Sequence, residues 1–335
     1  MREKENTTMG FWKELPPYPK ILAPMADVTD IAFRTMIAKY SRMGERGGGP
    51  QALYTEFVAA DGLCNEEGRK KLMHMLAYEK EKRPIVAQIF SADPEKMECA
   101  ARLCLELGFD GVDINMGCPE HNIVKQGAGS ALIQTPQKAQ EIIAATKRGV
   151  EGKIPVSVKT RIGWTSDEVE TWIPTILETD VAAIILHGRT RKEMSKVPAR
   201  WDRIARAAAI VHASGKPTLL IGNGDVTSLV QAEEYQNRYG VDGVMIGRGV
   251  FGTPWFFDAE QRHAPQTVAE RLRILLEHSR LFAQLLPHKN FNIMKKHYKA
   301  YVHGFDGAKE LRIALMEAKD VDAVAKIVEV YLSEY

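Results

Sequence analysis

Short apolar segments rich in β-branched residues alternate with longer segments of helical periodicity over residues 20–262. There are eight apolar segments, at 20–25, 52–57, 84–90, 111–116, 154–160, 181–188, 217–224 and 241–247. Such alternation is typical of βα units around a parallel sheet. Eight units within about 240 residues predict an α/β fold of the (β/α)₈ TIM-barrel type.

Two of the intervening segments carry clear helix boundaries. The segment 94–108 starts with Pro94, which suits a first helical turn, after Asp93 as the N-cap, and it ends at Gly108. The segment 135–149 repeats this order of a polar cap, a proline and a final glycine. We therefore expect a helix in each segment, leading from one strand to the next.

After residue 262 the strand pattern stops, and amphipathic helical segments follow to the end of the sequence. The residues HAPQ at 263–266 interrupt both patterns and are typical of a linker. We expect a barrel domain at 1–262, which would carry the chemistry, and an all-α helical domain at 265–335.

The stretch SRMGERGGGP at 41–50 is too rich in glycine for regular structure. A phosphate-binding loop follows a strand directly and opens a helix, and this stretch does neither. We therefore interpret it as a flexible surface insertion without a function.

The composition, with 45% apolar and 26% charged residues, is that of an ordinary globular protein. The residues MREKENTTMGFWKEL at 1–15 carry charges of both signs, unlike a signal peptide. No later segment has roughly 18 uninterrupted apolar residues, which a membrane-spanning helix needs. We expect a cytoplasmic protein with no membrane partner, and the sequence is compatible with a monomer.

Four cysteines are present, without a C-x-x-C pair or a His/Cys cluster at metal-binding spacing. They are Cys64, Cys99, Cys104 and Cys118. We expect no metal site and, in a reducing compartment, four free thiols.

The net charge of +2 says little about partners, but its distribution says more. Residues 278–305 contain five lysines and arginines and no acidic residue, with aromatic residues between them. This pattern favours a surface that binds nucleic acid, and it equally fits a solvated helix face whose aromatic side chains pack inward. The basic residues are Arg280, Lys289, Lys295, Lys296 and Lys299.

Polar residues gather where the predicted strands end, which is where barrel enzymes place their chemistry. The sequences GNGD at 222–225 and GRG at 247–249 follow strands seven and eight, where backbone N–H groups and Arg248 suit a phosphate, although each glycine pair also fits an ordinary tight turn. Lys159 ends an apolar strand, so it either faces a negative group or extends out of the barrel mouth.

Eight motifs resemble the tRNA-dihydrouridine synthase family, in the family's order over residues 20–260, and the tail at 295–312 resembles the family's helical domain. The motifs are APMADVTDIAFR (23–34), QIF (88–90), DINMGCP (113–119), GAGSALI (127–133), VKTRIGW (158–164), LHGRTR (186–191), GNGD (222–225) and IGRG (246–249). The resemblance implies an FMN-binding barrel that uses NADPH to reduce the C5–C6 double bond of particular uridines in tRNA.

Matched residue by residue, the resemblance implies a set of flavin contacts. These are Pro24, Met25, Ala26, Gln88, Lys159, His187, Asn223, Gly224, Asp225, Gly247 and Arg248. It also implies that hydride from flavin N5 adds to C6 of uracil and that Cys118 donates the proton to C5 from the opposite face. Without the resemblance, a free cysteine such as Cys118 is more typically a small buried apolar residue.

The resemblance places Asn115 on the substrate side, and charged residues of the barrel rim and of the basic tail are candidates for RNA phosphates. The candidates are Lys125, Arg161, Arg189, Lys295, Lys296 and Lys299. One segment departs from the family pattern, which has a glycine and an alanine before the aromatic residue at 201, so the substrate contacts of residues 192–200 stay open.

Two alternatives remain at this point. A different FMN barrel, such as a dihydroorotate dehydrogenase, would share the phosphate loops but has little use for a basic helical tail. A tRNA-binding RNA chaperone with secondary turnover would keep the tail, and the presence of Cys118, Lys159 and the glycine loops weighs against it.

Overall fold

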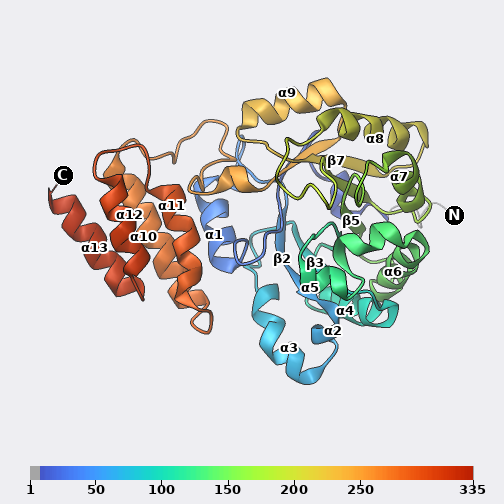
Figure 1. Cartoon of the computed structure of the whole chain (residues 1–335), viewed down its shortest axis with the longest axis horizontal. Helices are drawn as coiled ribbons and strands as arrows, with labels where there is room; N and C mark the ends of the chain where they lie inside the picture. Colours follow the sequence, from blue (N-terminus) through green and yellow to red (C-terminus); the bar gives the residue numbers. More distant parts are fainter. Residues whose placement is uncertain (1–7, 335) are drawn as a thin grey trace.

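The computed structural model describes residues 8–334, and its centre is a barrel of eight parallel strands (Figure 1). The strands are β1 Lys20–Leu22, β2 Leu53–Ala59, β3 Ile85–Phe90, β4 Gly111–Met116, β5 Val156–Arg161, β6 Ala183–His187, β7 Leu219–Asn223 and β8 Gly243–Ile246. They pair in the order β1-β8-β7-β6-β5-β4-β3-β2, and a bridge between Ile21 and Ala52 joins β1 to β2. The predicted TIM barrel is confirmed. Residues 1–7, part of the stretch in which we expect no signal peptide, lie outside the described residues.

Helices surround the strands and cover their apolar side chains, so the main core lies between the two layers. They are α1 Ile31–Tyr40, α2 Ala60–Leu63, α3 Glu66–Leu72, α4 Pro94–Glu106, α5 His121–Lys125, α6 Pro136–Gly149, α7 Val169–Leu177, α8 Trp201–Ala213 and α9 Leu229–Tyr239. The predicted helices at 94–108 and 135–149 are confirmed as α4 and α6. Asp93 caps α4 by accepting from the N–H groups of Glu95 and Lys96.

Four further helices follow the barrel and lie together beside α1 (Figure 1). They are α10 Val268–Leu285, α11 Lys295–Tyr301, α12 Ala308–Glu317 and α13 Val321–Glu334. They enclose a second core, to which α1 contributes Ala32 and Met36. The predicted all-α region is confirmed, and it is fastened to the barrel through α1. No helix within residues 8–334 has the length and apolar character to span a membrane.

The glycine-rich segment 41–50 is anchored, which differs from the slack insertion that its composition suggests. Arg42 is buried and forms an ion pair with the buried Asp258 at 3.1 Å. The Ser41 hydroxyl donates to the carbonyl of Pro254 at 2.6 Å and accepts from the N–H of Phe257 at 3.0 Å. These partners lie more than two hundred residues later in the chain, so local composition does not reveal them.

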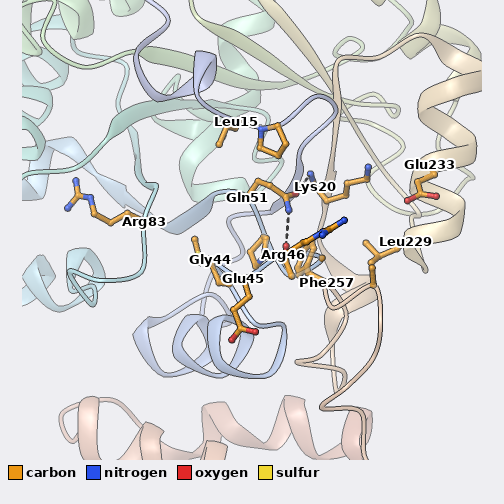
Figure 2. A pocket seen from close by; sticks show the side chains of 16 residues that line it. Leu15, Lys20, Gly44, Glu45, Arg46, Gln51, Arg83, Leu229, Glu233 and Phe257 are labelled. Carbon is orange, nitrogen blue, oxygen red and sulfur yellow. Dashed lines mark hydrogen bonds between the residues drawn. The ribbon is translucent and has the colours of Figure 1, made fainter.

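A pocket of 490 Å³ lies beside this segment (Figure 2). Lys20, Gln51 and Arg83 line it where β1, β2 and β3 begin, so it opens at the amino ends of the strands. The Gln51 side chain donates to the carbonyl of Gly48 at 3.1 Å and fixes the segment there. None of the predicted site residues lines this pocket, and we assign it no chemistry.

The expectation of four free thiols is wrong for two of them. Cys64, at the end of α2, and Cys99, on α4, form a disulfide across 35 residues of sequence. The sequence spacing gave no sign of this pair because β3 separates the two helices along the chain while the barrel brings them side by side. Cys104 is a buried free thiol, and Cys118 is free and half-buried.

Candidate functional site

A cavity of 620 Å³ lies at the carboxyl ends of the strands. Predicted flavin contacts that line it are Pro24, Met25, Lys159, His187, Asn223, Gly224, Asp225, Gly247 and Arg248. Two predicted contacts do not line it. Ala26 is exposed beside Met25, and Gln88 is fully buried on β3, where its amide group is bonded to other side chains.

The two glycine loops form one wall of this cavity, and close approach requires glycine in both. At Gly224, which has a φ of +133°, a Cβ would lie 2.6 Å from the Ala199 Cβ. At Gly249 a Cβ would lie 2.4 Å from the carbonyl oxygen of Val226. The loops are therefore shaped by contacts that a side chain would break, which explains the glycines without appeal to a ligand.

Cations dominate the charge of the cavity. The Lys159 ammonium donates to the Asn223 side chain at 3.1 Å and forms no ion pair with an acidic side chain of residues 8–334. Burial, with the neighbouring Arg161, lowers the pKa of Lys159 to about 8. Lys159 therefore stays mostly charged at neutral pH. The charge of Asp113 favours the ammonium only in part, and no carboxylate of residues 8–334 forms an ion pair with it, which favours an anionic ligand.

His187 is neutral in this surrounding. Burial lowers its pKa well below the usual value, and the charges of Arg161, Lys159 and Arg189 act in the same direction. The Arg189 guanidinium lies 3.1 Å from His187 Nε2. Because a guanidinium only donates hydrogen bonds, Nε2 must accept and the ring proton must be on Nδ1. Nδ1–H is thus the group that His187 can offer to a ligand.

Asp225 neutralises part of this positive charge and holds the loops around it. Its carboxylate accepts from Arg248 at 3.0 Å, from the Ala199 N–H at 2.8 Å and from Arg189. Three segments far apart in the sequence therefore meet at one side chain. Asp225 therefore fixes Arg189 and Arg248 at the cavity wall.

Cys118 lies in the loop that leaves β4. The Asn115 side-chain oxygen accepts from the N–H groups of Gly117 at 3.1 Å and Cys118 at 2.9 Å, and Arg161 donates to the Gly117 carbonyl at 2.7 Å. The thiol packs against an apolar cluster that includes Phe90. Burial raises the pKa of Cys118, so the thiol is protonated at neutral pH and is able to donate.

Arg161 and Arg189, predicted as contacts for RNA phosphates, are almost fully buried and bond to the protein itself. Arg161 donates to the carbonyls of Thr190 and Met194, and Arg189 donates to that of Val197. The two arginines thereby hold the segment 190–200 over the cavity.

Met194 and Ser195 from this segment line the cavity and were missed by sequence reasoning. The departure from the family pattern lies here too, and within this segment Arg200 pairs with Glu193 at 2.9 Å. The segment can be identified as part of the site only from its position in the structure, because its sequence contains no residue type typical of a ligand-binding site.

The remaining substrate candidates lie outside the cavity. Lys125 is exposed at the end of α5, Lys296 and Lys299 are exposed on α11, and Lys295 is half-buried beside them. The three lysines of α11 line a groove of 890 Å³ against α12. Further residues of the groove are Lys309, Arg312, Ile313 and Met316. Sequence reasoning missed Lys309 and Arg312 because acidic residues flank them in α12.

An eight-stranded barrel with a cation-lined cavity at the carboxyl ends of its strands is the architecture of a barrel enzyme. The chain belongs to the dihydrouridine synthase family: the family model described as dihydrouridine synthase matches residues 21–334. This is a family of oxidoreductases, and the match favours this reading over a dihydroorotate dehydrogenase.

Curated relatives agree with the family model. The chain is 40% identical over 321 residues to a probable tRNA-dihydrouridine synthase of Staphylococcus aureus (strain MRSA252), covering 95% of this chain and 93% of that protein. It is 38% identical over 334 residues to probable tRNA-dihydrouridine synthase 2 of Bacillus subtilis (strain 168), covering 98% of each. The similarity thus includes the C-terminal helices.

Solved structures support the fold alone. The chain superposes on histamine dehydrogenase from Rhizobium sp. 4-9 with a TM-score of 0.54 at 11% identity, covering 78% of this chain and 48% of that one. It superposes on 6-hydroxypseudooxynicotine amine oxidase from Pseudomonas geniculata N1 with a TM-score of 0.53 at 13% identity, covering 76% and 50%.

Proposed function

We propose that this protein is an FMN- and NADPH-dependent tRNA-dihydrouridine synthase in which Cys118 supplies the proton for the reduction of uracil. The observation that carries this proposal is the position of a protonated, half-buried thiol in the loop after β4, at the same barrel end as a cation-lined cavity. The family and the named relatives point to the same reaction.

The residues of the cavity fit FMN. The cavity volume of 620 Å³ is within the range of cofactor sites, and the cations Lys159 and Arg248 line it. Arg248 and the backbone of the loop at 247–249 would hold the phosphate, and Lys159 would face the negative charge of the reduced ring. FMN, when bound and reduced by NADPH, supplies the hydride for C6 of uracil.

The chain's own groups then handle the proton. Cys118 would donate it to C5 from the face opposite the flavin, because a thiol with a raised pKa is protonated before the reaction. Asn115 uses its oxygen and one N–H inside the protein, which leaves its second N–H for the uracil. Arg161 holds the Cys118 loop through Gly117, so we assign it to positioning.

The tRNA would contact the groove between α11 and α12 and the rim of the barrel. The groove gathers five cations, Lys295, Lys296, Lys299, Lys309 and Arg312, against a single acidic residue, Glu317. Such a surface attracts a polyanion, and its exposed Ile313 and Met316 offer apolar contact to sugar or base. Lys125 at the rim is a further candidate for a phosphate contact.

The test is to incubate the purified FMN-loaded protein with NADPH and either unmodified tRNA transcript, free uridine or orotate. We expect dihydrouridine at defined positions of the tRNA, mapped by mass spectrometry of nuclease fragments, and no reduction of the small molecules. Reduction of orotate would support a small-molecule enzyme instead. Tight tRNA binding without any product would support an RNA chaperone.

A further inference from the structure

Polar side chains form a layer inside the barrel, directly below the cavity. The parallel register places Gln88 of β3 opposite Asp113 of β4, and Asp113 opposite Ser157 of β5. All three are at most 2% exposed. Buried polar groups need hydrogen-bond partners, and burial of an ionisable group such as Asp113 is unfavourable unless specific contacts compensate for it. Asp113 does not line the cavity, and the proposed function gives it no role.

The hydrogen bonds of this layer have a fixed direction that starts at Cys118. The backbone N–H groups of Gly117 and Cys118 donate to Asn115 Oδ1, so the other end of that amide, Nδ2, must be the donor. It donates to Gln88 Oε1 at 3.1 Å. Gln88 Nε2 must then donate as well, and it does so to Asp113 Oδ2 at 2.6 Å.

Asp113 closes the series because an ionised carboxylate accepts on both oxygens. Its Oδ1 accepts from the Ser157 hydroxyl at 2.6 Å, and its Oδ2 accepts from Gln88. An amide or a hydroxyl in place of the Asp113 carboxylate could either donate to Gln88 or accept from it. The ionised carboxylate only accepts, so Gln88 Nε2 has to donate to it. The orientation of both amides is therefore set from the bottom of the barrel upward.

We propose that Asp113 is a positioning residue that holds the Cys118 loop through the side chains of Gln88 and Asn115. The proposal rests on the proposed function, in which the Cys118 thiol must point at the uracil. Asp113 does not line the cavity. It acts through Gln88, whose N–H donates to Asp113 while its oxygen accepts from Asn115.

Protonation of Asp113 is expected to release this constraint. A protonated carboxyl can donate to Gln88 as well as accept from it, so it no longer holds Gln88 Nε2 in place, and in the reversed amide the bond from Asn115 is lost. Burial raises the pKa of Asp113 to about 6, and Ser157, Gln88 and the charge of Lys159 lower it in part. The ionisable groups that face Asp113 are Lys159 from β5 and the buried phenol of Tyr54 from β2.

The experiment measures the reactivity of the Cys118 thiol in the FMN-loaded protein without tRNA. A dipyridyl disulfide reacts with thiols in both mildly acidic and neutral solution, and mass spectrometry of the peptide that contains Cys118 identifies the modified residue. Asp113→Leu removes the acceptor, so the loop loosens and the rate at neutral pH rises about tenfold, the effect of one lost buried hydrogen bond.

Asp113→Asn keeps the test valid where Asp113→Leu does not fold. Asparagine, like the protonated acid, can donate to Gln88 as well as accept from it, so it no longer fixes that amide, and the rate at neutral pH rises toward the rate that the wild type reaches in acid. The increase in reactivity that we expect for the wild type below a pH of about 6 is absent in this variant, because it cannot be protonated there.

Ser157→Ala is the matched control, since it removes the other hydrogen bond of Asp113 and leaves the bonds from Gln88 to Cys118 in place. We expect wild-type thiol reactivity from it at about pH 8, where Asp113 stays ionised although it has lost the bond from Ser157 that lowers its pKa. Unchanged reactivity in a folded Asp113→Leu protein, or the acidic increase persisting in Asp113→Asn, would overturn the proposal. These thiol measurements need no turnover, so a failure of the proposed function appears separately, as dihydrouridine made without Cys118.

Discussion

Lys159 shows at the scale of one residue how burial prepares the cavity for an anion. It lies at the carboxyl end of β5, where no described acidic side chain pairs with it, and its pKa of about 8 reflects burial beside Arg161. Between pH 8 and the usual lysine pKa the free protein prefers the neutral amine. An anionic ligand reverses that preference by favouring the ammonium form.

FMN affinity should therefore fall as the pH rises above about 8, because binding then has to take up a proton at Lys159. Lys159→Met should bind FMN more weakly at neutral pH and without this pH dependence. Flavin fluorescence titration between about pH 7 and pH 9, one unit on either side of the Lys159 transition, measures both effects. If FMN affinity fell equally steeply with pH in Lys159→Met and in the wild type, a group other than Lys159 would be the one that titrates.

Single residues also show what the sequence can and cannot reveal. Cys118, Lys159 and the two glycine loops stand out because their types are unusual at a strand end. Asp113 and Gln88 do not, because a polar residue in an apolar strand has no visible partner until the register places β3 beside β4. The disulfide between Cys64 and Cys99 was hidden for the same reason.

The strands were predictable as elements because a parallel strand is buried on both faces and needs an unbroken apolar run. The ends of the strands were harder to predict. For example, β1 stops at Leu22 rather than at residue 25, because Pro24 has no N–H to donate to a neighbouring strand. The helix α3 has no fully buried residue and therefore leaves no apolar stripe to detect.

Two histidines sit in the interface of α10, α11 and α1. His278 and His297 are buried with their rings 4.7 Å apart, and Phe33 of α1 contacts both. Burial lowers the pKa of His278 to about 3 and that of His297 well below its usual value. Both imidazoles are therefore neutral in the folded protein and are protonated only in the unfolded chain at mildly acidic pH.

The unfolded state thus binds more protons below a pH of about 6.5, and the free energy of unfolding should decrease as the pH falls from there toward 4. Each histidine contributes up to about 1.4 kcal/mol per pH unit. His278→Leu should remove part of this slope, as measured by urea unfolding at several pH values. Ser279→Ala, at the neighbouring buried position of α10, is the control and should leave the slope unchanged, because it removes no histidine. An unaltered slope in His278→Leu would contradict this account.

At the scale of the whole molecule, one buried ion pair connects the C-terminal helices to the cavity. Lys289, in the loop after α10, lies 2.8 Å from Glu56 of β2, and the two side chains are 9% and 1% exposed. The other oxygen of Glu56 accepts from the N–H of Asp27 at 2.7 Å, beside the cavity residues Pro24 and Met25. The C-terminal helices are therefore linked to the cavity wall through Glu56.

Lys289→Met should destabilise the protein by about 3 kcal/mol or more, because Glu56 then stays buried without a counter-charge. Adding Glu56→Gln should recover much of that loss. Urea unfolding measures both, and FMN affinity should follow the same order. Lys39→Met is the matched control: it breaks an exposed pair with Glu277 that also joins α1 to α10, and it should cost under about 1 kcal/mol. Equal costs for the two lysines would refute the role of burial.

The basic groove makes a prediction about the tRNA. Replacing Lys295, Lys296 and Lys299 by Ala should weaken tRNA binding and lower the slope of log affinity against log salt by about 2, while FMN stays bound. The control replaces three lysines in loops that precede strands, at the other end of the barrel; these are Lys80, Lys153 and Lys216. If both triple variants lose the same affinity, overall charge rather than the groove attracts the RNA.

At the scale of the whole molecule, the sequence reveals where the barrel pattern ends but not how the two parts pack together. The change from strand to helix pattern near residue 262 was visible in the sequence, and the helical region follows it. The sharing of α1 between two cores was not visible, because an amphipathic pattern shows that a face is covered but not by which element. The limits 1–262 and 265–335 remain a prediction.

Cys118→Ala tests the central claim most directly. In the FMN-loaded variant, NADPH should still bleach the flavin absorbance at the wild-type rate, while dihydrouridine formed in tRNA falls by about 100-fold or more, the usual contribution of a positioned acid. Cys104→Ala, which removes the other free thiol from the core, should form product normally. Wild-type dihydrouridine yield in Cys118→Ala would contradict the account, because the proton would then come from another group.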